Sequence, residues 1–224
     1  MVAEVERLKP DVLMLQEVSL DAGVPEKLAQ KLPNYHLSLC GREGRNAHLG
    51  HAILSLKKPS SEERLALSQQ RIAQKITLSI SGKKIILVNV HAYFNLLRDG
   101  PRQQHIRQIL DFADKPAIIG GDFNALPSYK SLKLIQERFV SAHLQANGSE
   151  PAKTMPTPLW RGPGIRHSMR RSGLRLHGGG TVDYIFVEKS LKIAKCRIAF
   201  DKPAPNNPLL FASDHFGLVA DIVI

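Results

Sequence analysis

Short apolar runs of strand length recur from one end of the chain to the other, and few of the segments between them have helical periodicity. Such runs, bounded by turn residues, are typical of buried β-strands. Strands are therefore expected at 11–18, 35–39, 51–56, 73–80, 84–91, 117–124, 181–187, 192–200 and 216–224, and helices at 2–9, 25–32, 101–114 and 128–137. Because strands and helices do not alternate strictly, the pattern predicts a two-layer β core flanked by helices rather than a series of βαβ units.

The 224 residues are expected to form one domain, because no repeat or linker divides the chain. The longest apolar runs are far shorter than the roughly 18 residues of a membrane-spanning helix, so no transmembrane segment is expected. The first residues include Glu4 and Glu6 and do not resemble a signal peptide, which favours a cytoplasmic location. Cys40 and Cys196 are too few for a disulfide framework or a zinc site and are expected to be reduced and buried.

The chain carries a formal net charge of +11, which favours an anionic partner such as nucleic acid, a membrane surface or a phosphorylated small molecule. Between Pro151 and Val182 there are six basic residues and no acidic one, within a stretch at 145–181 that is expected to be one long loop region. Such a loop could follow a nucleic-acid backbone, and its tryptophan could stack on a base. The alternatives are a solvated basic loop and a surface for anionic lipid headgroups. The expected nucleic-acid contacts are Trp160, Arg161, Arg166, Arg170, Arg171 and Arg175.

Acid, amide and imidazole side chains gather where several predicted strands end or begin. Each has an ordinary structural interpretation: a strand-end carboxylate can lie on the surface, Asp and Asn with Gly form turns, and a histidine can be a structural hydrogen-bonding group. A carboxylate inside an apolar strand is harder to explain, because burying it is costly without a partner. The residues are Glu17 in LQEV, His91 in NVHA, Asp122 and Asn124 in GGDFN, Asp183 in VDYIFV, and Asp214 and His215 in SDHFG.

Taken together, these residues form a chemically coherent set. The carboxylates and the amide supply oxygen ligands, which suit Mg²⁺ or Mn²⁺ better than zinc. The two histidines supply acid–base groups, and an aspartate can orient one of them. A divalent ion among acidic residues also allows a phosphodiester to approach carboxylates, because the ion polarises the phosphoryl oxygen and helps to generate hydroxide.

These motifs, in this order and spacing, resemble the endonuclease/exonuclease/phosphatase superfamily, which includes exonuclease III-type, deoxyribonuclease I-type and sphingomyelinase-type enzymes. The resemblance runs from residue 10 to the end of the chain. It implies an α+β fold: a four-layer α/β/β/α sandwich in which two packed mixed β-sheets are flanked by helices. Members of the family begin with a further core strand that carries an Asn ligand, whereas this chain starts within the helix that follows. The domain over 1–224 is therefore expected to be short at its N-terminus.

The resemblance also implies a role for each site residue. Glu17 and Asp214 would serve the metal, which would be Mg²⁺ or Mn²⁺. Asp122 would orient or deprotonate the attacking water, and Asn124 would bind a phosphate oxygen. His215, paired with Asp183, would bind or protonate the phosphate. His91 would lie at the scissile phosphate, as in several branches of the family.

The predicted function is therefore Mg²⁺-dependent phosphodiester hydrolysis by an endo- or exonuclease acting on DNA or RNA. The first alternative is the same chemistry on a phospholipid, a sphingolipid or a phosphoinositide. The second is a basic nucleic-acid-binding module with weak or no catalysis because the first strand is missing.

Overall fold

The computed structural model describes residues 1–95, 98–114, 116–161 and 179–224, and of residues 160 and 161 only the backbone. A six-stranded mixed sheet forms one of its two β layers. In spatial order its strands are β4 (Ser61–Leu67), β5 (Arg71–Ile80), β6 (Lys83–His91), β7 (Ala117–Asp122), β9 (Asp183–Glu188) and β8 (Phe139–Ser141). Strands β6 and β7 are parallel, and every other neighbouring pair is antiparallel. Strands β5 and β6 are buried along most of their length, as expected for strands that are covered on both faces.

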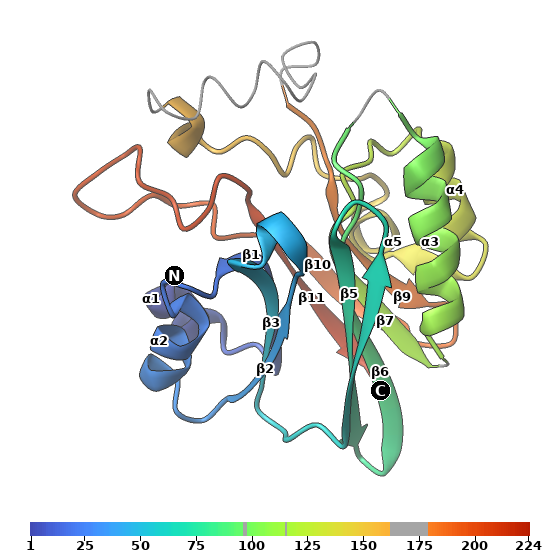
Figure 1. Ribbon diagram of the computed structural model, residues 1–224, viewed down its shortest axis with the longest axis horizontal. Coiled ribbons are helices and arrows are strands. Elements are labelled where there is room, and N and C mark those ends of the chain that lie inside the picture. The colour runs from blue at the N-terminus through green and yellow to red at the C-terminus, as the bar shows by residue number, and fades with distance from the viewer. Residues whose placement is uncertain (96–97, 115, 162–178) are drawn as a thin grey trace.

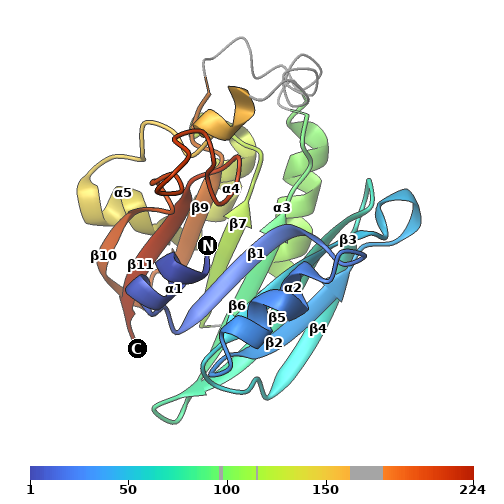
Figure 2. The ribbon, with the colours of Figure 1, turned by 90° about the vertical axis from the view of Figure 1, so that its left-hand side faces the viewer.

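The second β layer consists of two separate antiparallel sheets. One has the order β1 (Val12–Ser19), β3 (Leu49–Ser55), β2 (His36–Gly41), and the other pairs β10 (Lys192–Ala199) with β11 (Gly217–Val223). In the described part of the chain β1 pairs only with β3, and β11 pairs only with β10. These two edge strands are neighbours in the layer (Figure 2). Both sheets pack on the six-stranded sheet through one apolar cluster that includes Met14, Ile53, Ile118, Val187 and Ile222.

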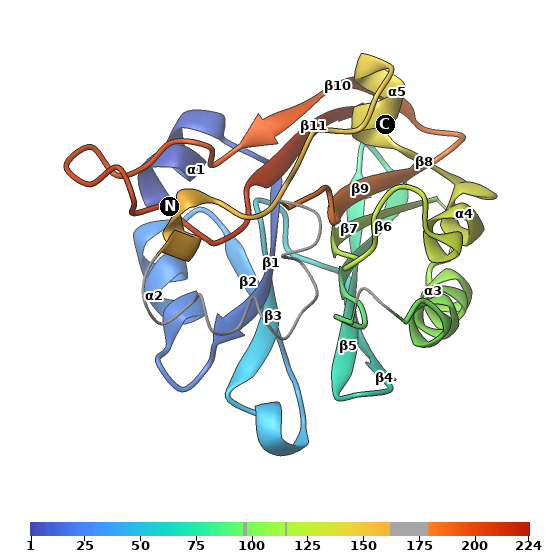
Figure 3. The ribbon, with the colours of Figure 1, turned by 90° about the horizontal axis from the view of Figure 1, so that it is seen from above.

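Helices cover the outer faces of the two β layers. Helices α1 (Val2–Leu8) and α2 (Val24–Lys31) lie on the sheet β1–β3–β2, while α3 (Gly100–Phe112) and α4 (Lys130–Gln136) lie on the six-stranded sheet (Figures 1 and 3). Helix α5 (Ala142–Asn147) lies beside β9 and β10. On the outer side of the six-stranded sheet, Ile106, Ile109 and Leu132 pack with buried β-strand residues such as Val88 and Ile119.

The predicted α+β sandwich with four layers is confirmed, with one difference in its sheets. Only the six-stranded sheet is mixed, because the helical crossover through α3 makes β6 and β7 parallel. The second layer has antiparallel pairs throughout and is divided in two. Cys40 and Cys196 are free and buried, as predicted.

Three elements were not expected from the sequence. Strand β4 lies at the edge of its sheet and exposes Glu62, Glu63 and Arg64, so it has no apolar run to predict it. Strand β8 has only three residues, and α5 occupies 142–147, which overlaps the start of the predicted loop region. The Ser141 side chain caps α5 and is a local signal for the start of a helix. The signal is easily overlooked because the helix has only six residues. Two 3₁₀ helices, η1 (Gly44–Asn46) and η2 (Pro158–Arg161), complete the described elements.

None of the helices in the described ranges is at once long enough and apolar enough to cross a membrane.

Candidate active site

Three of the predicted site residues form a row across the middle of the six-stranded sheet. His91 at the end of β6 is in register with Asp122 at the end of β7, which is in register with Asp183 at the start of β9. Residues in register on neighbouring strands direct their side chains to the same face of the sheet. The parallel pairing of β6 and β7 therefore brings two strand-end groups together, and the antiparallel β9 adds a third.

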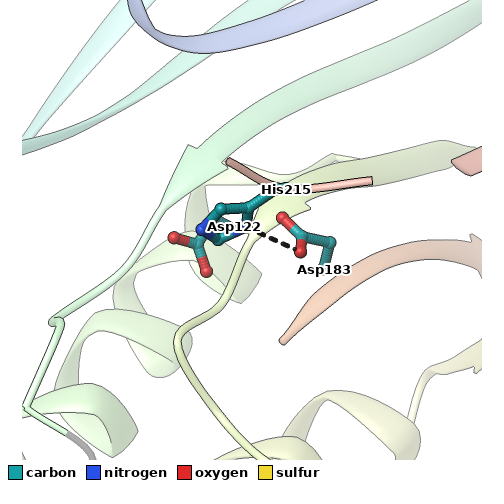
Figure 4. Close-up of side chains that lie close together, drawn as sticks. All are labelled: Asp122, Asp183 and His215. Carbon is teal, nitrogen blue, oxygen red and sulfur yellow. Dashed lines mark hydrogen bonds and ion pairs between the residues drawn. The ribbon is translucent and has the colours of Figure 1, made fainter. Parts of the chain in front are cut away.

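His215 reaches this row from the other β layer, just before β11. Its Nδ1 donates a hydrogen bond to Asp183 Oδ2 at 2.9 Å, and Asp122 lies beside the pair (Figure 4). Burial by itself lowers the pKa of His215, but the charge and the hydrogen bond of Asp183 outweigh it and raise that pKa to about 10. The backbone of Asp183 is fixed in turn, because its N–H donates to Thr154 Oγ1. His215 is therefore cationic at neutral pH.

Asp122 is a buried carboxylate that is oriented by the turn that follows it. Its Oδ1 accepts from the backbone N–H of Asn124 at 2.7 Å, and its Oδ2 accepts from Asn124 Nδ2 at 2.9 Å. This closed geometry requires a left-handed backbone at Asn124 (φ 48°), which Asn tolerates better than most residues. Burial, followed by the nearby charge of Asp183, raises the pKa of Asp122 to about 7. The carboxyl group is thus set to exchange a proton near neutral pH.

Glu17 enters the site through a β-bulge. The pairing of β1 with β3 shifts register between Leu15 and Val18, so that Gln16 and Glu17 together face a single position of β3. Glu17 also has a left-handed backbone (φ 52°), which is costly for a residue other than glycine and typical of functional positions. The preceding Gln16 donates to Asn89 Oδ1 on β6 at 2.6 Å, which ties the bulge to the opposite layer.

Two arginines that sequence reasoning missed hold Glu17 in place. Arg42 follows β2 and Arg71 opens β5, and each places Nη1 3.2 Å from Glu17 Oε1. Both guanidinium groups are buried, with only 2% of the Arg42 side chain exposed, whereas 48% of the Glu17 side chain is exposed. The signal available in the sequence was an arginine at the start of a long apolar strand, but nothing in the sequence placed it beside Glu17.

The same two arginines help burial to keep His91 neutral. Arg42 Nη2 lies 2.9 Å from His91 Nδ1, and Arg71 Nη1 lies 2.9 Å from His91 Nε2. Burial, and then the charges of Arg71 and Arg42, hold the pKa of His91 well below its usual value. His91 is therefore a neutral imidazole that lies 3.3 Å from Asp122 Oδ2, and it is not a cationic acid. A neutral imidazole accepts through one nitrogen only, so at most one of the arginines donates to it at a time.

Asp122, Asp183 and His215 form the group of acidic and imidazole side chains that could share a metal ion within the described residues. Their ligand atoms lie within 4.8 Å of one another. Glu17 and Asp214 are not in this group. Asp214 Oδ1 instead accepts from Ser213 Oγ at 3.2 Å, and its charge helps to raise the pKa of the neighbouring His215. The assignment of Glu17 and Asp214 to the metal stays a prediction.

The predicted nucleic-acid contacts fall largely outside the described residues. Arg166, Arg170, Arg171 and Arg175 lie there, and for Trp160 and Arg161 only the backbone is described, as part of η2. The basic segment leads into β9, which starts with Asp183.

Comparison with known proteins finds one matching family. Residues 1–215 match the model of the endonuclease/exonuclease/phosphatase family. No curated protein matches the sequence.

Several solved structures have the same fold. An endonuclease/exonuclease/phosphatase from Bacteroides vulgatus has a TM-score of 0.75 at 19% identity, over 100% of this chain and 88% of its own. Humanized TDP2 from D. rerio has a TM-score of 0.75 at 17% identity, over 100% and 89%. The catalytic domain of human Nocturnin, solved with a bound sulfate anion, has a TM-score of 0.68 at 23% identity, over 99% and 83%. At these identities the likeness is one of fold.

Proposed function

Because the chain belongs to the endonuclease/exonuclease/phosphatase family, we propose that it is a divalent-metal-dependent hydrolase of phosphodiester bonds in nucleic acid. The observation that carries this proposal is the group formed by Asp122, Asp183 and His215. It combines a carboxyl group that exchanges its proton near neutral pH with an imidazolium that is held by a second carboxylate. Hydrolysis of a phosphodiester needs both a group that takes a proton from water and a cation that stabilises negative charge.

The residues of this cluster divide the chemistry between them. Asp122, with both oxygens positioned by Asn124, would orient the attacking water and accept its proton. His215 uses Nδ1 for Asp183, so that Nε2–H would donate to a phosphate oxygen or to the leaving oxygen. Asp183 fixes the orientation of the imidazole and keeps it protonated. His91 is neutral and would act as a hydrogen-bonding group beside Asp122.

A divalent cation fits the chemistry of this cluster. The charge of Asp183 contributes to the raised pKa of Asp122, and a cation would relieve that repulsion. Carboxylate oxygens are the ligands that Mg²⁺ and Mn²⁺ prefer. Asp183, together with Glu17 and Asp214, which were predicted to serve the metal, would hold the ion, and this leaves Asp122 as the proton acceptor. When bound, the ion would polarise a phosphoryl oxygen and lower the pKa of a water molecule.

The charge of the chain favours nucleic acid as the substrate. The net charge is +11, and the stretch between Pro151 and Val182 holds six basic residues, five of them arginine, and no acidic one. Arginine is well suited to bind the oxygens of a phosphate group. The catalytic domain of human Nocturnin, which has the same fold, was solved with a bound sulfate anion, which is tetrahedral like a phosphate group.

The first test is hydrolysis with and without metal. With Mg²⁺ or Mn²⁺ the protein should nick plasmid DNA or degrade a labelled oligonucleotide, and EDTA should abolish the reaction. Undiminished hydrolysis in EDTA would contradict the metal dependence.

The second test separates the substrate classes. Labelled DNA and RNA oligonucleotides are compared with sphingomyelin and a phosphoinositide under the same Mg²⁺ conditions. Hydrolysis of a lipid alone would replace the nuclease proposal by the lipid alternative. Binding of the oligonucleotide without hydrolysis of any substrate would favour the second alternative, a nucleic-acid-binding module.

A further inference from the structure

Phe94 is an exposed aromatic side chain three residues beyond His91. It is 48% exposed and is the only exposed Phe, Tyr or Trp among the side chains whose burial is described. The other exposed large apolar side chains are aliphatic or methionine. An isolated exposed apolar residue needs no explanation by itself. What distinguishes Phe94 is its position and the way its backbone is held.

Arg71 links Phe94 to the candidate active site. Its guanidinium carbon lies 5.7 Å from the centre of the Phe94 ring, within cation–π range. The same guanidinium lies 2.9 Å from His91 Nε2 and 3.2 Å from Glu17 Oε1. Arg71 also lines a hollow of about 350 Å³ together with Arg64 and Gln70. Contacts through Arg71 and then His91 therefore connect the Phe94 ring to Asp122, which would orient the attacking water.

A buried arginine fixes the backbone on both sides of Phe94. Arg102, which is fully buried on α3, donates from Nε to the Tyr93 carbonyl and from Nη2 to the Asn95 carbonyl. It is held in turn by Asp99 at 2.7 Å. Burying a guanidinium is costly, so its use to anchor the two carbonyls that flank one exposed aromatic residue indicates that the position of that residue matters.

The ring of Tyr93 supports the Phe94 ring from within the molecule. The two ring centres are 5.6 Å apart in a tilted arrangement, and Tyr93 also packs edge-on against His105 of α3 at 6.5 Å. An aromatic ring that is fixed at its backbone, packed against a second ring and still half exposed is suited to stacking, because little side-chain freedom is lost when a planar group binds.

We propose that Phe94 is a stacking platform for the nucleobase next to the scissile phosphoester. This subsite rests on the proposed nuclease function and makes it more specific, because the substrate must then carry a planar base beside the phosphate. Stacking on an aromatic side chain tolerates any base, so the platform would contribute affinity without strong sequence preference. Arg71 would complete the subsite, with its charge directed to the phosphate that joins this base to the strand.

Binding provides a test that does not require catalysis. A single-stranded oligonucleotide containing 2-aminopurine is titrated with the protein in EDTA, and the quenching of its fluorescence on stacking is recorded. Phe94→Ala should weaken binding about tenfold and remove the quenching, while Phe94→Trp should retain both. Leu56→Ala is the matched control, because Leu56 is also exposed but directly follows β3 at the end away from the Glu17 bulge. Quenching and affinity that are unchanged in Phe94→Ala would overturn the proposal.

A second oligonucleotide, with tetrahydrofuran residues in place of all its bases, separates stacking from a general effect. Phe94→Ala and the parent should bind this strand equally, and the weaker binding of the variant should appear only with the base-containing strand. An equal loss on both strands would overturn the platform and indicate a structural role. If the variant instead lost binding to phosphatidylserine vesicles but not to the oligonucleotide, Phe94 would be a membrane contact.

Hydrolysis in Mg²⁺ distinguishes failure of the platform from failure of the proposed function. In an active parent, Phe94→Ala should raise KM for the base-containing strand about tenfold with little change in kcat. A parent that binds with quenching but hydrolyses nothing would refute the proposed function and leave the platform supported. An active parent whose KM is unaffected by Phe94→Ala would refute the platform alone.

Discussion

The two β layers of this protein contribute to the candidate site in different ways. The six-stranded sheet is continuous, and it places His91, Asp122 and Asp183 in one row through strand register alone. The other layer is divided into two sheets, and it delivers Glu17 through a bulge and His215 from the segment just before β11. Strand register is enough to bring side chains together within one sheet, whereas side chains from separate sheets must be held by polar contacts.

Pairs of oppositely charged side chains make those contacts. Glu17 is held by Arg42 and Arg71, and His215 is held by Asp183. Arg42 follows β2 of the divided layer itself, whereas Arg71 on β5 and Asp183 on β9 belong to the continuous sheet and tie the two layers together.

The row in the continuous sheet should be indispensable for catalysis. Asp122→Asn keeps the size of the side chain but removes the proton acceptor, so hydrolysis of an oligonucleotide should fall about 10³-fold. The control is Asp114→Asn, at the other end of the sheet, where the carboxylate is largely exposed and pairs with Lys75. Circular dichroism should confirm that both variants are folded. Comparable activity of Asp122→Asn and its control would remove Asp122 from the mechanism.

Replacing an isoleucine by alanine should lower the free energy of unfolding more in the continuous sheet than in the divided layer. Ile119 on β7 is fully buried, and Ile119→Ala should lower the free energy of unfolding by about 4 kcal/mol. Ile222 on β11 is only partly buried, and Ile222→Ala should cost about 1 kcal/mol. Urea denaturation measures both. Equal losses would show that the edge strand β11 is packed as firmly as the central strand β7.

The contact between the layers at His215 should govern a pH dependence. The folded-state pKa of His215 is raised to about 10, above its ordinary value near 6.5. Its stabilising contribution is therefore fully present below about pH 6.5 and is lost as the pH rises through 10. Asp183→Asn should move the pKa of His215 towards 6.5 or below and should flatten this part of the stability curve. NMR titration of the imidazole in metal-free protein measures the pKa, and an unmoved value would contradict the pairing.

At the exposed edge of the continuous sheet, an ion pair should contribute little to the free energy of unfolding. Arg64 on β4 lies 2.7 Å from Glu43, and both side chains are substantially exposed. Arg64→Gln should change the free energy of unfolding by less than about 0.5 kcal/mol, because solvent screens such a pair. The measurement is thermal and urea unfolding at low and high salt. A loss above about 1 kcal/mol would mean that this edge is more tightly coupled to the sheet than its exposure suggests.

Much of the fold could be predicted because its strong signals are local. The apolar runs at β1, β5, β6, β7, β9 and β11 and the amphipathic helix α3 all lie where periodicity places them. Strands β4 and β8 were not predicted, because an exposed edge strand and a three-residue strand have little apolar pattern. The division of the second layer into two sheets could not be read from the pattern either, since the pairing of strands far apart in the chain leaves no local trace.

The order of residues along the chain was enough to predict which chemical groups gather at the ends of the strands: carboxylates, an amide and two histidines in motifs that resemble one family. The charges of these groups, in contrast, depend on contacts that form only when the chain is folded. His91 and His215 have the same side chain, yet one is kept neutral by burial beside Arg42 and Arg71, and the other is kept cationic by Asp183. The reason is physical, because a pKa depends on burial and on charges within a few ångströms, and these neighbours come from distant parts of the chain.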